Sequence, residues 1–121
     1  MCYTPFMKVN FYQTSSGRKP VEEFVSGLSK ADQVLFDTIR KGIEQDGLKF
    51  PYVIFKPIEG KLWEIKFKGL DGSYRIAYVL VSGPQMIWLH AFKKKTQKIS
   101  RLDLELAWKR MKEVLNHEKE N

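Results

Sequence analysis

The strongest strand signal in the chain lies in residues 61–93, which read KLWEIKFKGLDGSYRIAYVLVSGPQMIWLHAFK. Three runs in it, at 61–68, 73–81 and 86–93, are rich in aromatic and β-branched side chains, the composition typical of β-strands. The two connections, GLDG and SGPQ, have the length and the glycine content of hairpin turns. Residues 61–93 therefore predict a three-stranded antiparallel meander.

The alternation along these strands predicts what each face of the sheet contains. Symmetric closure of the first turn places Lys66 opposite Arg75. The second turn then sets Phe92 beside Arg75, with His90 on the same face. The opposite face becomes an aromatic and aliphatic slab that helices can cover, because successive side chains of a strand point to opposite sides. We expect the polar face to collect Glu64, Lys66, Lys68, Arg75, His90, Phe92 and Lys94.

The flanking segments predict an α+β domain. Residues 8–12 alternate weakly, as a short strand does, and Pro20 begins a helix that a second helix, capped by Ser29, follows closely. Residues 48–60 carry two prolines and predict an irregular crossing with one short edge strand. A C-terminal amphipathic helix comes last. The order of strand, two-helix hairpin, three-strand meander and helix predicts a small, mostly antiparallel sheet with its helices on one face, in a single domain over residues 1–121.

The chain is strongly basic, and its charge is unevenly distributed. Of the 121 residues, 21 are Lys or Arg and 14 are Asp or Glu, which leaves a net charge of +7. Residues 61–98 hold eight basic and two acidic residues, so most of the net charge lies there. This balance favours a polyanionic partner such as RNA, or good solubility.

Composition also argues against several other classes of protein. Cys2 is the one cysteine and there are two histidines, so we expect no disulfide framework, no metal site and no cofactor. The longest apolar run, residues 76–81, is far below the roughly 18 residues that a membrane span needs. Lys8 and Arg18 interrupt the N-terminal region before a signal peptide's apolar segment can form. We therefore expect a cytoplasmic protein with no membrane partner.

The polar face carries the clearest functional signal. Two cations directly opposite each other, as Lys66 and Arg75 are, destabilise a sheet. A face lined with cations, with Phe92 as a platform for one base, suits a phosphodiester backbone. Three purely structural interpretations of these residues remain open as alternatives to RNA binding. The lysines are merely solvated, Glu64 is an ion-pair partner of Arg75, and His90 is a hydrogen-bonded structural histidine.

The same stretch resembles a known family. The motifs at residues 63–66, 74–75 and 89–96, followed by a helix containing residues 104–107, are similar to those of the HigB-type, phage-derived branch of the RelE/ParE toxin superfamily. The resemblance covers about residues 20–115. It implies a RelE/ParE-like fold and the toxin half of a type II toxin–antitoxin pair. Its partners would be a cognate antitoxin, a HigA-like helix-turn-helix protein, together with the ribosome, its RNA and messenger RNA.

The resemblance further implies an activity, which is ribosome-dependent endonucleolytic cleavage of mRNA. In this chemistry the ribose 2′-OH attacks the adjacent phosphate, and no metal is needed. Arg75 would bind the scissile phosphate, and Lys66 or Lys68 would act as base. The further groups that could transfer protons are His90, Glu64 and Lys94. The RNA-binding set that we infer from the clustered charge and the aromatic platform is Lys61, Phe92, Lys93, Lys95 and Lys98.

Two other functions are open alternatives: a gyrase-inhibiting, ParE-like toxin without catalysis, and a basic RNA-binding module. The convergence of cations on one row of the sheet favours the nuclease. Because Arg75 faces away from the apolar slab, we expect Arg75→Ala to abolish toxicity without lowering stability. We expect the antitoxin to dock on the helix hairpin and on residues 48–60, where the mixed aromatic and basic residues are Lys49, Phe50, Tyr52, Phe55 and Lys56.

Overall fold

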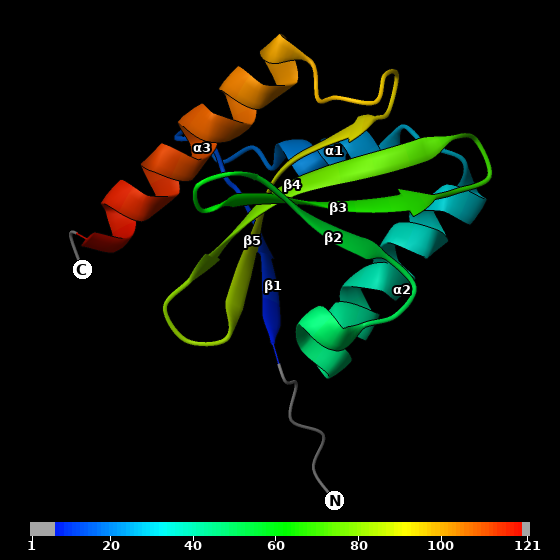
Figure 1. Ribbon diagram of the computed structural model, residues 1–121, viewed down its shortest axis with the longest axis horizontal. Coiled ribbons are helices and arrows are strands. Elements are labelled where there is room, and N and C mark those ends of the chain that lie inside the picture. Colours follow the sequence, from blue (N-terminus) through cyan, green and yellow to red (C-terminus); the bar gives the residue numbers. More distant parts are fainter. Residues whose placement is uncertain (1–6, 120–121) are drawn as a thin grey trace, which may run out of the picture.

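The computed structural model describes residues 7–119 and shows an α+β fold. One five-stranded sheet runs in the order β1-β5-β4-β3-β2, with β1 parallel to β5 and every other pair antiparallel. The predicted class and the mostly antiparallel sheet are confirmed. The elements, shown in Figure 1, are β1 (Lys8–Phe11), α1 (Pro20–Ser26), α2 (Lys30–Asp46), the 3-10 turn η1 (Gly47–Lys49), β2 (Ile54–Glu59), β3 (Leu62–Lys68), β4 (Ser73–Val81), β5 (Gln85–Lys93) and α3 (Arg101–Lys119).

The predicted register of the meander is confirmed for most of its length. Lys66 pairs with Arg75 across β3 and β4, and Arg75 pairs with Phe92 across β4 and β5. The second hairpin departs from the prediction after Ala77, where the register shifts and leaves Leu89 without a partner. Such a bulge adds one residue to one strand and turns its side chains. The alternation of polar and apolar residues in the sequence does not predict this bulge.

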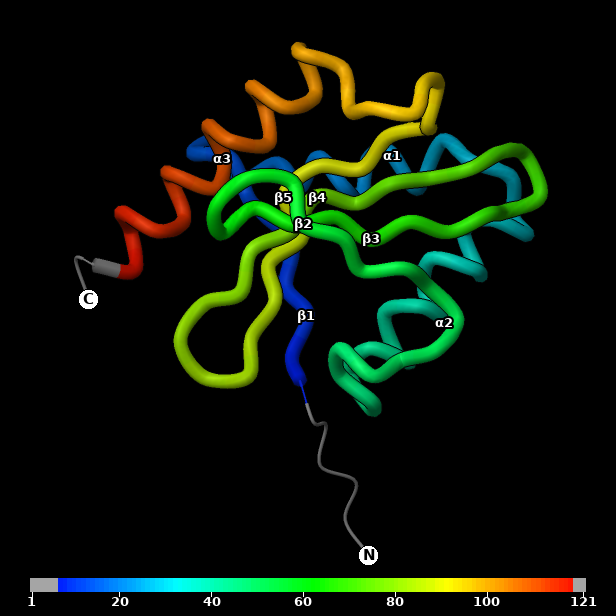
Figure 2. Tube along the Cα trace, viewed as in Figure 1, coloured from blue at the N-terminus to red at the C-terminus, as the bar shows by residue number. Residues whose placement is uncertain are grey.

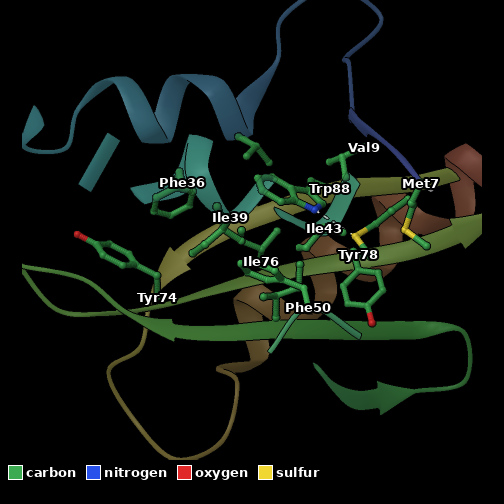
Figure 3. Packing of buried hydrophobic residues seen from close by; sticks show 14 residues of the cluster. Met7, Val9, Phe36, Ile39, Ile43, Phe50, Tyr74, Ile76, Tyr78 and Trp88 are labelled. Atoms are coloured by element: carbon green, nitrogen blue, oxygen red, sulfur yellow. Dashed lines mark hydrogen bonds between the residues drawn. The ribbon is translucent and has the colours of Figure 1, made fainter. Parts of the chain in front are cut away.

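The helices α1 and α2 cover the apolar slab, as predicted (Figure 3). Phe36 of α2 lies edge-to-face on Tyr74 and on Phe67, with ring centroids 5.2 and 4.9 Å apart. Ile39 and Ile43 follow one and two turns later and are almost fully buried. Their spacing on one side of α2 matches the slab, so this face forms the main core.

The expectation that all helices lie on one face is wrong. Helix α3 packs across the other face of the sheet, on the side away from α2 (Figure 1). Part of that face is apolar, with Leu62, Val79 and Leu89 fully buried against Ala107 and Met111 of α3. Apolar strand residues on both faces require cover on both. The polar face is therefore confined to the end of the sheet where β3 finishes and β4 begins.

One buried carboxylate joins α2 to the β3–β4 turn. Ser29 caps α2 by accepting a hydrogen bond from the Asp32 backbone N–H at 3.3 Å. The Asp32 side chain accepts hydrogen bonds from the backbone N–H groups of Leu70 (2.7 Å) and Asp71 (3.0 Å) and from the Tyr74 hydroxyl (2.5 Å). These bonds stabilise the ionised form and lower the pKa of Asp32, the bond from Tyr74 contributing most.

We expect Asp32→Asn to lower the free energy of unfolding at pH 7. In strong acid, the free energies of unfolding of the variant and the parent should be equal. A carboxyl whose pKa is lowered by folding stabilises the protein above its unfolded pKa, near 4, and loses that contribution as the pH falls through the folded pKa. Urea midpoints at pH 7 and in strong acid measure the difference. The control is Asp37→Asn, which removes an exposed carboxylate from the same helix. Equal midpoints for Asp32→Asn and the parent at pH 7 would contradict the role of this carboxylate.

Candidate functional site

Most of the predicted site residues gather where β3, β4 and β5 meet the loop that precedes α3. We call residues 93–98, KKKTQK, the lysine loop; it runs from the end of β5 toward α3 (yellow to orange in Figure 2). Lys93, Lys95 and Lys98 are exposed on it, and Lys94 is half-buried. The backbone N–H of Lys94 donates to the carbonyl of Ser73 at 2.8 Å, so β4 holds the start of the loop.

Arg75 lies beneath this loop and is only 2% exposed. Its Nη1 is 3.6 Å from Oε2 of Glu64, which is also buried. Its Nη2 donates to the carbonyl oxygens of Gln97 at 2.6 Å and Thr96 at 3.4 Å. The ion pair with Glu64, an open alternative from the sequence, is therefore present. Arg75, which the sequence predicts as the phosphate ligand, does face away from the apolar slab, but the lysine loop covers it. The alternation of a strand shows which face a side chain takes but not what covers that face.

Lys66, like Lys94, is half-buried. Its pKa is lowered, first by its partial burial and then by the positive charges of Lys94, Lys56 and Arg75. The nearby Glu64 acts in the opposite sense and does not outweigh them. A lysine in such surroundings releases its proton more readily than a solvated lysine, so the neutral amine that a general base requires is more accessible.

Two hollows border these amines and meet at Lys94. The larger, about 640 Å³, lies under the lysine loop and the start of α3. The smaller, about 200 Å³, lies over the β3–β4 hairpin, beside Lys66 and Lys68. Lys94 lines both. The charged side chains that line the larger hollow are five cations and one carboxylate, and the other lining residues are uncharged. The full lining comprises Phe24, Arg75, Phe92, Lys93, Lys94, Lys95, Thr96, Lys98, Ser100, Leu102 and Asp103.

The structure covers one of the predicted RNA-binding residues and separates another from the rest. Phe92 is 9% exposed and stacks on His90 with ring centroids 5.0 Å apart, so its ring is already covered. Lys61 precedes β3, at the opposite end of that strand from Lys68. It lies near Glu118 of α3, whose pKa is lowered first by hydrogen bonding with Ser82 and then, to a smaller extent, by the charge of Lys61. The sequence places Lys61 near the other lysines by number, but an extended strand separates them in space.

His90 has a partner that the sequence reasoning missed. Its Nε2 lies 2.7 Å from Oδ1 of Asp103, and the other carboxylate oxygen accepts a hydrogen bond from the Ser100 hydroxyl at 2.7 Å. Burial lowers the pKa of His90 despite this carboxylate, which favours the neutral ring. A neutral ring that contacts a carboxylate through Nε2 carries its proton there and donates it to Asp103. Ser100 and Asp103 have the spacing of an N-terminal helix cap. The sequence therefore predicts only a capping role for Asp103 and does not indicate its contact with His90.

Within residues 7–119 no group of three or more His, Cys, Asp or Glu side chains could hold a metal ion. Cys2 lies outside the described residues. In the same part of the chain, no helix has the length and apolar character to cross a membrane.

The chain matches a known protein family. Residues 23–112 match the sequence model of the family described as phage derived protein Gp49-like (DUF891). The matched segment contains the buried Arg75–Glu64 pair, the lysine loop and the contact between His90 and Asp103. No curated protein matches the chain.

Proposed function

The chain belongs to the phage-derived Gp49-like family, and from this premise we propose that it is the toxin of a type II toxin–antitoxin pair that cleaves messenger RNA on the ribosome. The family comprises toxin-like proteins, which supports the general class. The observation that carries the finer proposal is the convergence of the half-buried Lys66 with Lys94 and the lysine loop on two adjoining cationic hollows. Adjoining cationic hollows suit consecutive phosphates of one strand.

In the proposed reaction, Lys66 as a neutral amine takes the proton of a ribose 2′-OH. The 2′-oxygen attacks the adjacent phosphorus, and the bond from phosphorus to the 5′-oxygen breaks. Lys94, as an ammonium group beside both hollows, returns a proton to the leaving 5′-oxygen. The products are a 2′,3′-cyclic phosphate and a 5′-hydroxyl end. Glu64 takes no part in proton transfer in this scheme, because it is buried against Arg75.

The ribosome has a specific part in this proposal. The site is a cationic surface, and Phe92, the aromatic ring expected to hold a base, is already covered. Orientation of the 2′-OH in line with the leaving oxygen must then come from the ribosome, which can contribute a large part of the rate.

We expect purified protein to cleave mRNA on translating ribosomes at least about 100-fold faster than the same RNA free in solution. A 2′-deoxy substitution at the cleaved nucleotide should abolish cleavage, and the downstream fragment should carry a 5′-hydroxyl. The measurement is primer extension and end-group analysis of both RNAs. If mRNA stays intact on ribosomes and the protein instead blocks DNA supercoiling by gyrase, the ParE-like alternative is favoured. RNA binding without cleavage or toxicity would favour the binding module.

The edge strand β2 is the proposed docking surface for the antitoxin. Tyr52 and Ile54 are 80% and 61% exposed, and Lys56 is exposed beside them. As an outer strand, β2 presents backbone N–H and C=O groups on its free side, where an added strand can pair. Phe50, expected in this surface, instead lies buried in the main core. We propose that the antitoxin covers the remaining residues of this edge.

A further inference from the structure

The lysine loop is an unusual segment because it concentrates like charges and has little backbone pairing of its own. Four of its six residues are lysines, which repel one another. Its first part is held by the bond from Lys94 to Ser73, and Thr96 bonds within the loop to the carbonyl of Lys98 at 2.5 Å. In the described chain, the hydrogen bonds that join the middle of the loop to the sheet come from Arg75.

We infer that Arg75 is a positioning residue: its guanidinium holds the lysine loop closed through the carbonyl oxygens of Thr96 and Gln97, and it does not itself bind the phosphate. The consequence for RNA rests on the proposed function. The effect on the loop does not, because it concerns the free protein.

The geometry around Arg75 supports this role. The side chain is 2% exposed, with one terminal nitrogen donating to the loop and the other facing Glu64. A guanidinium is a flat fork of donors and can bond a carbonyl on one side and a carboxylate on the other. A phosphate could reach these nitrogens only after the loop had left them. The closed loop and a direct phosphate contact by Arg75 therefore exclude each other.

The arrangement also has a consequence for the substrate. With the loop closed, Lys94, Lys95 and Lys98 all line the larger hollow. Arg75 thus supports a cluster of cations that would otherwise spread apart. Removing it should weaken RNA binding by dispersing the lysines.

The first experiment uses ¹⁵N-detected NMR of the arginine side chains in the full-length protein. We expect slowly exchanging guanidinium signals from Arg75 in the free protein. The protein is then titrated with a single-stranded RNA made of 2′-O-methyl nucleotides, which cannot be cleaved. We expect the Arg75 signals to keep their chemical shifts while the backbone amide signals of Lys94 and Lys98 shift. Arg110 is the control, because its Nη1 also donates to a backbone carbonyl, that of Leu89 at 2.9 Å. Movement of the Arg75 signals together with those of Lys94 would overturn the inference.

The second experiment needs no RNA. Heteronuclear NOE values of the lysine loop should approach those of β5 in the parent, fall in Arg75→Gln and be partly restored in Arg75→Lys, which retains donors for the carbonyl oxygens. Unchanged values in both variants, or low values in the parent, would contradict the role of Arg75 even if RNA binds. Failure of the RNA to bind at all would contradict the proposed function, while the loop measurement would still decide the role of Arg75. If a variant fails to fold, the NOE values of the parent still test whether the lysine loop is held closed.

Discussion

Toxicity should be lost in Lys66→Met while the fold remains intact. Methionine has nearly the length of lysine but carries no amine, so the proposed base is removed. General-base catalysis typically contributes about 10²–10⁴-fold in rate, and we expect a loss of ribosomal cleavage in that range. Stability should not fall, because Lys66 is surrounded by the like charges of Lys94, Lys56 and Arg75. Growth after induction, cleavage rate on ribosomes and a thermal melt measure the three effects.

Two further variants separate the charge of Lys66 from its basicity. Lys66→Arg keeps the positive charge but cannot give up its proton near neutral pH, so it should bind RNA and cleave slowly. Lys109→Met removes an exposed lysine from α3, remote from the proposed chemistry, and should remain fully toxic. Full toxicity of Lys66→Met would place the base elsewhere. Full activity of Lys66→Arg would show that only the charge is needed.

The second large effect concerns stability. Arg75→Met should destabilise the protein by about 3–5 kcal/mol, the usual cost of removing one partner from a buried ion pair. The Glu64 carboxylate would stay buried without its cation, and the carbonyls of Thr96 and Gln97 would lose their donor. This expectation replaces the one drawn from the sequence, in which Arg75 faces away from the apolar slab and its removal does not lower stability.

A double-mutant cycle tests the ion pair directly. Adding Glu64→Leu to Arg75→Met should recover most of the lost stability, because well-packed apolar side chains can replace a buried pair with little cost. Urea denaturation of the two single variants and the double variant gives the coupling. Arg101→Met, which breaks an exposed pair with Glu105, is the control and should leave the midpoint unchanged. An unchanged midpoint in Arg75→Met would show that the buried pair does not stabilise the fold.

Much of the fold was predictable because its signals are local. Strand alternation and glycine-bearing turns predicted β3, β4 and β5 and the pairing of Lys66 with Arg75. The polar cap at Ser29 and the left-handed Gly47 mark the two ends of α2, and both follow from backbone chemistry within a few residues. These features depend on neighbours in the chain, so a single sequence is sufficient to predict them.

The candidate site was only partly predictable, because its geometry depends on segments that meet across the fold. Alternation correctly placed Arg75, Lys66 and Glu64 on one face, since a strand has a period of two. It could not show that the lysine loop covers Arg75, that α3 packs on part of the same face, or that Asp103 reaches His90. Each of these depends on how a loop and a helix pack against strands distant in sequence. The sequence by itself determines which cations share one face of the sheet. Tertiary packing decides which of these cations remain accessible to a substrate and which are buried and hold the others in place.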